Sequence, residues 1–178
     1  MFTPVRPMQA ACCQLCALNF VSHAKAKAAA LAAKEERKAD KVKLDGMKSR
    51  QDWLKECQSV INRIVRLRDI DEPCISCDRP AAWSGQWHAS HLRSVGSASA
   101  VRFHLWNIHK ACSICNNHLS GNIAEYLPRV RKKIGDEKVD WLYTQNHLAK
   151  HNIDYLRRLK SVMSRKLKRM ERRHAMQG

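Results

Sequence analysis

The chain has 178 residues, which is enough for one modest domain with arms or for two very small domains, and too few for one large core. Its 33 Lys and Arg residues outnumber 16 Asp and Glu residues, giving a formal net charge of +17 at pH 7. This charge favours a polyanionic partner bound through phosphate contacts, so nucleic acid is the first partner to consider. No apolar run approaches the roughly 20 residues that span a bilayer, and no signal-peptide pattern opens the chain. We therefore expect a soluble, intracellular protein with no membrane partner.

The positive charge is concentrated on the flanks of the chain. Residues 71–128 carry four acidic and four basic residues, so the whole net charge lies outside this segment. Residues 23–50 are rich in Ala and Lys, contain no Pro and are interrupted only by Gly46, which predicts a long basic helical arm. Its apolar face is mostly alanine, so a merely solvated helix and a DNA-contacting helix both remain open.

Two further segments have the three- and four-residue apolar spacing of amphipathic helices. Residues 52–68 form the first, and Cys57 on its apolar stripe is expected to be a buried small hydrophobe. Residues 154–174 form the second, within a basic C-terminal helical region at 136–178. We expect this helix to pack one face on a partner helix, plausibly the one at 52–68, and to present the other face to phosphates. Membrane-surface binding is the alternative, which the absence of aromatic anchors on the apolar side disfavours.

Two Cys-x2-Cys pairs stand in the middle of the chain. The first is Cys74 and Cys77, the second is Cys112 and Cys115, and 34 residues separate them. Each pair can form a knuckle that supplies two thiolates to one tetrahedral zinc ion. A disulfide framework is the alternative for eight cysteines, but the chain shows no secretion signal. Four thiolates leave no open position on the ion, so we expect a structural zinc that replaces part of a small hydrophobic core.

The residues between and after these pairs predict a definite order of elements. We expect a strand at 87–91, a loop at 95–100, a second strand at 103–110 and a helix that starts within 116–122. Strand, loop, strand and helix, with His and Asn residues at these points, is the arrangement of an HNH nuclease. The expected fold class is therefore a small α+β protein. It has a treble-clef or ββα-metal HNH module at 51–135, with a structural four-cysteine zinc, flanked by long basic α-helices.

The hydrolysis of a phosphodiester requires a base, a cation and a group that holds the base in place. His91 is the expected base, because an imidazole titrates near neutral pH. Asn107 is expected to fix the loop and the imidazole by hydrogen bonds, and His118 to take part in catalysis. The cation is expected to be Mg²⁺ or Mn²⁺. Its candidate ligands are His88, Asn116, His118 and Asn122.

Several segments of the sequence resemble one phage protein family. They are residues 71–77, 102–103, 107–110, 112, 115–116, 118 and 120–122. They are similar to the NinG family of lambdoid phages, also called Rap, over roughly residues 50–135, and more weakly in the basic arms. The resemblance implies a structure-specific endonuclease that acts in phage homologous recombination on branched DNA such as Holliday junctions and D-loops. It also implies a location in the cytoplasm of the bacterial host.

The chain departs from the family pattern at three places. His88 stands where the family usually has an acidic residue, and a neutral ligand suits Mn²⁺ or a softer ion better than Mg²⁺. Ser90-His91-Leu92 replaces the usual Gly-His-Tyr. Residues 1–22 resemble only the second half of a four-cysteine finger. We expect a truncated or degenerate finger there; the alternative is an improvised site made by Cys12, Cys13, Cys16 and His23.

Three functions remain to be separated. The first is the metal-dependent endonuclease, and the second is a non-catalytic zinc-dependent DNA- or junction-binding protein that has no need of His91 and Asn107. The third is an RNA-binding assembly factor whose tryptophans stack on bases, although most of these tryptophans lie in apolar stretches. A homodimer is possible, since paired cuts need two active sites, but the sequence shows no symmetry.

Overall fold

The computed structural model describes residues 4–5 and 11–176. The chain divides into two compact units, residues 1–48 and 49–178. The first unit contains α1 (Gln14–Met47). The second contains, in order, α2 (Arg50–Arg68), β1 (Trp87–His91), η1 (Ser99–Val101), β2 (Ile108–Cys112), η2 (Ile114–His118), α3 (Ile123–Ile134), α4 (Asp136–Thr144) and α5 (Ile153–Ala175). No helix in the described part of the chain is long and apolar enough to cross a membrane.

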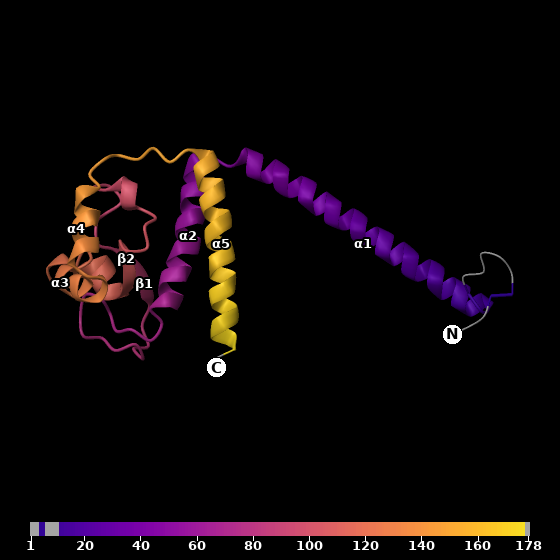
Figure 1. The fold of residues 1–178 in the computed structure, drawn as a ribbon, viewed down its shortest axis with the longest axis horizontal. Coiled ribbons are helices and arrows are strands. Elements are labelled where there is room, and N and C mark those ends of the chain that lie inside the picture. Colours follow the sequence, from indigo (N-terminus) through magenta and orange to yellow (C-terminus); the bar gives the residue numbers. More distant parts are fainter. Residues whose placement is uncertain (1–3, 6–10, 177–178) are drawn as a thin grey trace. The chain divides into compact units, whose positions relative to one another are not determined.

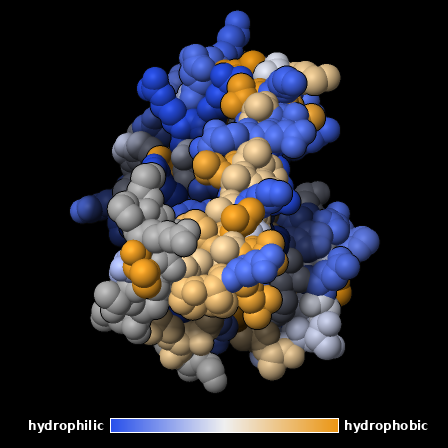
Figure 2. Space-filling model, turned by 90° about the vertical axis from the view of Figure 1, so that its right-hand side faces the viewer, coloured by the Kyte–Doolittle hydropathy of each residue, from blue (hydrophilic) through white to orange (hydrophobic). Residues whose placement is uncertain are grey.

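The predicted basic arm is a helix of 34 residues, α1, and none of its residues is buried. Its helix formers explain its length, and its few apolar side chains, such as Leu31 and Leu44, stay exposed. Figure 2 shows hydrophobic and hydrophilic residues side by side on one face of the molecule. The helix ends after Gly46 and Met47, close to the predicted boundary.

The two predicted amphipathic helices are confirmed, and α2 and α5 lie side by side (Figure 1). A capping box starts α2: the backbone N–H of Asp52 donates to Ser49 Oγ, and the N–H of Ser49 donates to the Asp52 carboxylate. Cys57 is buried as expected, and its thiol donates to the carbonyl of Leu156 at 3.2 Å. Residues 49–178 thus form one unit in which α5 covers the apolar stripe of α2.

β1 and β2 form an antiparallel two-stranded sheet, which pairs His91 with Ile108 and Trp87 with Cys112. Ala89 and Ile108 face α2, whereas Leu92 and Ala111 belong to the apolar cluster of the opposite side. That cluster is completed by α3 and α4, through Tyr126, Val130, Val139 and Leu142. The sheet therefore lies between the α2–α5 pair and the two short helices (Figure 1).

Two predicted boundaries are corrected by the structure. The first strand lies at 87–91 as predicted, but the second begins at Ile108 and not at residue 103, because residues 99–107 form tight turns. Around Cys115 the chain makes one wide helical turn, η2, and the regular helix α3 begins only at Ile123. Ser120, Gly121 and Asn122 have positive φ values of 49°, 89° and 50°. Three successive left-handed residues reverse the chain and prevent a continuous helix.

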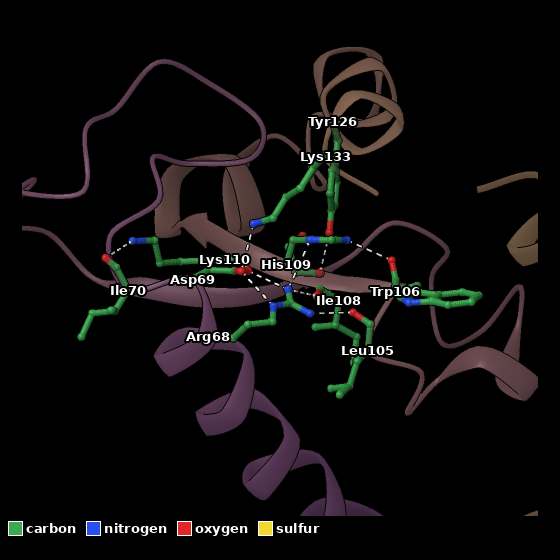
Figure 3. A network of polar contacts seen from close by, with 11 residues as sticks. Arg68, Asp69, Ile70, Leu105, Trp106, Ile108, His109, Lys110, Tyr126 and Lys133 are labelled. Carbon is green, nitrogen blue, oxygen red and sulfur yellow. Dashed lines mark hydrogen bonds and ion pairs between the residues drawn. The ribbon is translucent and has the colours of Figure 1, made fainter. Parts of the chain in front are cut away.

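A buried carboxylate joins α2 to the sheet and to α3 (Figure 3). Asp69, just after α2, accepts hydrogen bonds from Arg68 at 2.7 and 2.8 Å, from Lys133 Nζ at 2.9 Å and from the backbone N–H of Lys110 at 3.1 Å. Burial alone would raise the pKa of Asp69, but its bonds to Arg68 and Lys133 lower it to about 2. The carboxylate is therefore charged and fully bonded in the native protein.

We expect Asp69→Asn to lower the free energy of unfolding by about 3 kcal/mol at pH 7, because it removes the buried charge that accepts hydrogen bonds from Arg68, Lys133 and the backbone N–H of Lys110. The native pKa of about 2 lies below the ordinary value of 3.8, so this stabilisation is present above pH 4 and is lost as the pH falls towards 2. Urea unfolding at several pH values measures both effects. The control is Asp71→Asn at an exposed position, and equal urea midpoints for the two variants would contradict the assignment.

Candidate metal centre and active site

The four cysteines of the two Cys-x2-Cys pairs converge on one point. Cys74 and Cys77 lie in the segment after α2, Cys112 ends β2, and Cys115 lies in η2. Their Sγ atoms all lie within 4.8 Å of one another, and those of Cys77 and Cys112 are 3.9 Å apart. A tetrahedral zinc with Zn–S bonds of about 2.3 Å requires S–S distances of about 3.8 Å. This central cysteine cluster could therefore hold a metal ion such as zinc.

Hydrogen bonds to the sulfurs of Cys74, Cys77 and Cys112 favour the thiolate form, whereas burial raises the pKa of Cys74 and of Cys115. Backbone N–H groups of Ser76 and Cys112 donate to Cys74 Sγ at 3.4 and 3.2 Å. The Arg79 guanidinium donates to the sulfurs of Cys77 and Cys112 at 3.3 and 3.5 Å. Burial raises the pKa of Cys77, but its hydrogen bonds, first those from Arg79 and Cys74, bring that pKa down to about 7. Arg79 also offsets part of the negative charge that four thiolates would leave on a zinc ion.

A second group of cysteines lies at the start of α1. The sulfurs of Cys12, Cys13 and Cys16 lie within 4.8 Å of one another, and all three residues are exposed. His23 is not part of this group, so the alternative site with His23 as fourth ligand is not assembled. Residues 1–3 and 6–10 of the expected remnant finger, which was predicted at 1–22, lie outside the described residues.

Asn107 is fully buried and closes the loop between the strands. Its Nδ2 donates to the carbonyls of Arg93 and Val101 at 3.0 and 3.2 Å, and its Oδ1 accepts from the backbone N–H of Arg93 at 2.8 Å. The carbonyl of Asn107 in turn accepts from the backbone N–H of Leu92 at 2.8 Å. Asn107 therefore fixes the loop directly. In the described part of the chain its side chain makes no hydrogen bond with the imidazole of His91.

His91 is held instead by a main-chain carbonyl. Its Nε2 lies 3.0 Å from the carbonyl oxygen of Arg102, which requires the hydrogen to be on Nε2 and leaves Nδ1 with a lone pair. Burial lowers the pKa of His91 below its ordinary value of 6.5. The imidazole is thus neutral at pH 7, with one nitrogen anchored and the other able to accept a proton.

The candidate ligands of a catalytic cation are only partly brought together. His88 Nδ1 and Asn116 Nδ2 are 3.2 Å apart, but Asn122 donates to the carbonyl of Ser76 at 2.7 Å and His118 is exposed on η2. Apart from the two cysteine groups, no three His, Cys, Asp or Glu side chains of the described residues converge as metal ligands. His88 and Asn116 are thus neighbours, but the Asn116 atom that faces His88 is an amide nitrogen, which does not bind a cation; Oδ1 is the only atom of that amide that could be a ligand. The full set of four candidates does not converge.

Residues in a strand alternate between its two faces, so His88 and His91, three positions apart, point to opposite faces of β1. His88 shares the side of η2 and α3, whereas His91 shares the side of α2. The expected base and the expected cation ligands therefore flank the strand and do not lie on one surface.

The comparison with known proteins now decides the family. The sequence profile described as "Bacteriophage Lambda NinG protein" matches residues 1–173. This chain belongs to the NinG family. It is 37% identical over 131 residues to "Protein ninG" of Escherichia phage lambda, which is 72% of this chain and 63% of the relative. "Protein ninG" of Salmonella phage P22 is 36% identical over 131 residues, with 72% and 64% coverage. The chain thus spans less than two thirds of these NinG relatives, and no solved structure matches it.

Sequence reasoning missed two features of this NinG family member. The sequence singles out Arg102 only as part of the family resemblance, yet its carbonyl anchors His91. Arg79 follows Cys77 by two residues, and a cation so close to a thiolate pair is a signal that could have been used. His109, by contrast, lies buried between α2 and α3, and its Nε2 is 2.9 Å from the carbonyl of Trp106. Burial first, and then the charge of Arg68, lower the pKa of His109 to about 4, so its role is structural.

We expect the purified protein to hold one tightly bound zinc in the central cysteine cluster and Cys112→Ser to lose it, together with the fold of residues 49–178. Structural zinc supplies an apparent binding free energy of roughly 10 to 16 kcal/mol in small domains, more than this unit can replace. Metal analysis and circular dichroism measure the two losses.

The matched control is Cys57→Ser, which changes a buried cysteine outside the cluster and keeps a donor for the Leu156 carbonyl. It should retain the zinc of the wild type. Equal zinc content in Cys112→Ser and wild type would end the metal assignment.

Proposed function

We propose that this NinG family protein is a metal-dependent DNA endonuclease of the HNH type. Its proposed substrates are branched recombination intermediates such as Holliday junctions and D-loops. The observation that carries the proposal is the anchored imidazole of His91, whose Nδ1 has no hydrogen-bond partner among the described residues, at the end of β1 and beside a loop closed by Asn107. Asn107 would also serve a scaffold that only binds zinc, but such a scaffold does not require the anchored imidazole. The net charge of +17 supplies the attraction for DNA.

The chemistry follows from the atoms available. Nδ1 of His91 takes a proton from water as the water oxygen forms a bond to phosphorus. The bond from phosphorus to the leaving oxygen breaks, and the proton passes through solvent to that oxygen. The Arg102 carbonyl holds the ring in position during the transfer. A divalent cation, Mg²⁺ or Mn²⁺, would stabilise charge on the phosphate. His88 Nδ1 and Oδ1 of the neighbouring Asn116 would be its protein ligands, once the Asn116 amide has turned its oxygen towards His88.

The position of β1 allows groups on its two faces to act on one phosphate. The sheet has two strands, so β1 pairs with β2 along one edge and with no other described strand along the other. In this proposal a phosphate binds at this edge, where it would lie near the side chains of both faces and could accept from backbone N–H groups that do not bond to β2. In this proposal the substrate completes the site, since phosphate oxygens supply the cation ligands that the protein lacks.

The rival function is a zinc-dependent DNA- or junction-binding protein without catalysis. One observation favours it: the described residues assemble no cation site with three ionisable ligands beyond the cysteines. It explains the central cysteine cluster and the charge. It leaves the anchored imidazole without a purpose.

We expect His91→Ala to reduce the rate of junction cleavage by roughly 10² to 10⁴, the usual contribution of a general base. DNA affinity should change by less than about twofold, because a neutral histidine adds little to phosphate binding. His118→Ala should lose less activity, and added Mn²⁺ should restore part of it. His147→Ala, at an exposed histidine, is the control. If His91→Ala cleaves junctions at the wild-type rate, His91 is not the base, and the rival function is favoured.

We also expect the cleavage rate to rise with pH through a midpoint below 6.5 and to level off near neutral pH. The neutral imidazole is the active base, and burial lowers the pKa of His91, so activity is lost only as the pH falls through this lowered value. Single-turnover rates between pH 5 and pH 8 measure the profile. A midpoint above 7 would contradict His91 as the base.

A further inference from the structure

A hollow of about 330 Å³ lies along the exposed face of α2, on the side of the sheet that His91 faces. We name it the α2 hollow. Three cationic and three neutral polar residues line it, and no carboxylate does. They are Lys55, Gln58, Ser59, Asn62, Arg66 and Arg102.

The cations of this hollow differ from others on the same helix pair. Arg63 of α2 pairs with Glu171 at 2.6 Å, and Lys160 of α5 pairs with Glu56 at 2.6 Å. Lys55, Arg66 and Arg102 form no ion pair with any carboxylate of the described residues. Three like charges around one hollow repel one another, and a bound polyanion would relieve this repulsion.

The neutral residues of the hollow can complete the recognition of phosphate. Ser59 and Asn62 carry hydroxyl and amide donors, which bind phosphate oxygens readily. Gln58 connects the parts of the lining: its Nε2 donates to Asn62 Oδ1 at 2.9 Å, and its Oε1 accepts from Arg102 Nε at 3.3 Å. The helical spacing of the lining residues extends from Lys55 to Arg66, about 16 Å along α2. That length matches about five nucleotide steps of a DNA strand.

Arg102 connects the hollow to the proposed base. Its guanidinium lines the hollow, and its carbonyl anchors Nε2 of His91 at 3.0 Å. The hollow and the imidazole of His91 therefore share Arg102 as a common neighbour.

We infer that the α2 hollow binds the sugar-phosphate backbone of DNA and leads one strand to His91. This inference rests on the proposed function and adds the surface that positions the substrate. It assigns phosphate binding to α2 as well as to the basic face of α5 that the sequence indicates. Deleting α5 is a poor test of either surface, because Leu156 and Leu167 of α5 are buried in the second unit.

The test measures binding to a fluorescent four-way junction and to duplex DNA, over a range of salt concentrations and without Mg²⁺ or Mn²⁺. The variant Lys55→Gln/Arg66→Gln removes two cations of the hollow. We expect the slope of log K against log salt to fall by roughly 1.8, about 0.9 for each lost phosphate contact. The matched control is Lys132→Gln/Lys150→Gln, two exposed lysines outside the hollow, and it should keep the wild-type slope.

A second variant places a negative charge in the hollow with almost no change of shape. Asn62→Asp keeps the acceptor for Gln58 and should weaken binding about tenfold or more, since like charges across an interface are costly. Circular dichroism should show that every variant keeps the wild-type fold.

The outcomes separate this inference from the proposed function. Wild-type protein that binds but never cuts overturns the nuclease, while a lowered slope in Lys55→Gln/Arg66→Gln still supports the hollow. Wild-type protein that cuts, with an unchanged slope in that variant and unchanged affinity in Asn62→Asp, overturns the hollow alone. A slope that falls only after Arg165→Gln/Arg172→Gln on α5 also overturns it.

Discussion

A two-stranded sheet is the constraint on which the second unit depends. Such a hairpin is at best marginally stable by itself in water, so both of its faces must be covered. In this chain α2 and α5 cover one face, and α3, α4 and the cysteine knuckles cover the other. Two groups of polar side chains connect these layers. One is the buried carboxylate of Asp69, and the other is the central cysteine cluster at the end of β2 and in the adjoining segments. The apolar clusters alone are small, which is why the charged and metal-binding groups matter so much here.

The same hairpin places the proposed chemistry. β1 carries His88 and His91, and the loop that follows carries Arg102, whose carbonyl fixes the imidazole. A zinc ion held by the central cysteine cluster, at the other end of the hairpin, would have no open position for water, so it would position these elements and take no part in the reaction. In this account there are two ions with different roles. The cysteines would bind a structural zinc, and His88 with Asn116 would bind a cation that arrives with the substrate.

The parts of this structure that the sequence predicts are those with local signals. Periodic apolar residues predict α2 and α5, and the Cys-x2-Cys spacing predicts the central cluster. The predicted start of β2 was wrong because the buried Asn107 holds residues 99–107 in turns. The periodicity of the sequence does not reveal such turns. The predicted start of α3 was wrong because Ser120, Gly121 and Asn122 have left-handed backbone conformations.

The site was harder to predict, since it depends on contacts between distant segments. His91 and Arg102 are eleven positions apart, and the α2 hollow combines a helix face with a loop residue. Four cation ligands were expected, but the fold brings only two of them together. His88 and Asn116 meet, whereas Asn122 turns to the first knuckle and His118 to solvent. Sequence spacing placed these residues near one another along the chain, but the backbone turn after η2 separates them.

The most direct test of the central claim is cleavage by the wild-type, zinc-loaded protein. A labelled four-way junction, a D-loop and a plain duplex are each incubated with no added cation, with Mg²⁺ and with Mn²⁺, and the products are resolved on a denaturing gel. The account predicts cuts near the branch points that require the added cation and that leave the plain duplex mostly intact. Tight binding of all three substrates without a cut under any cation would contradict it.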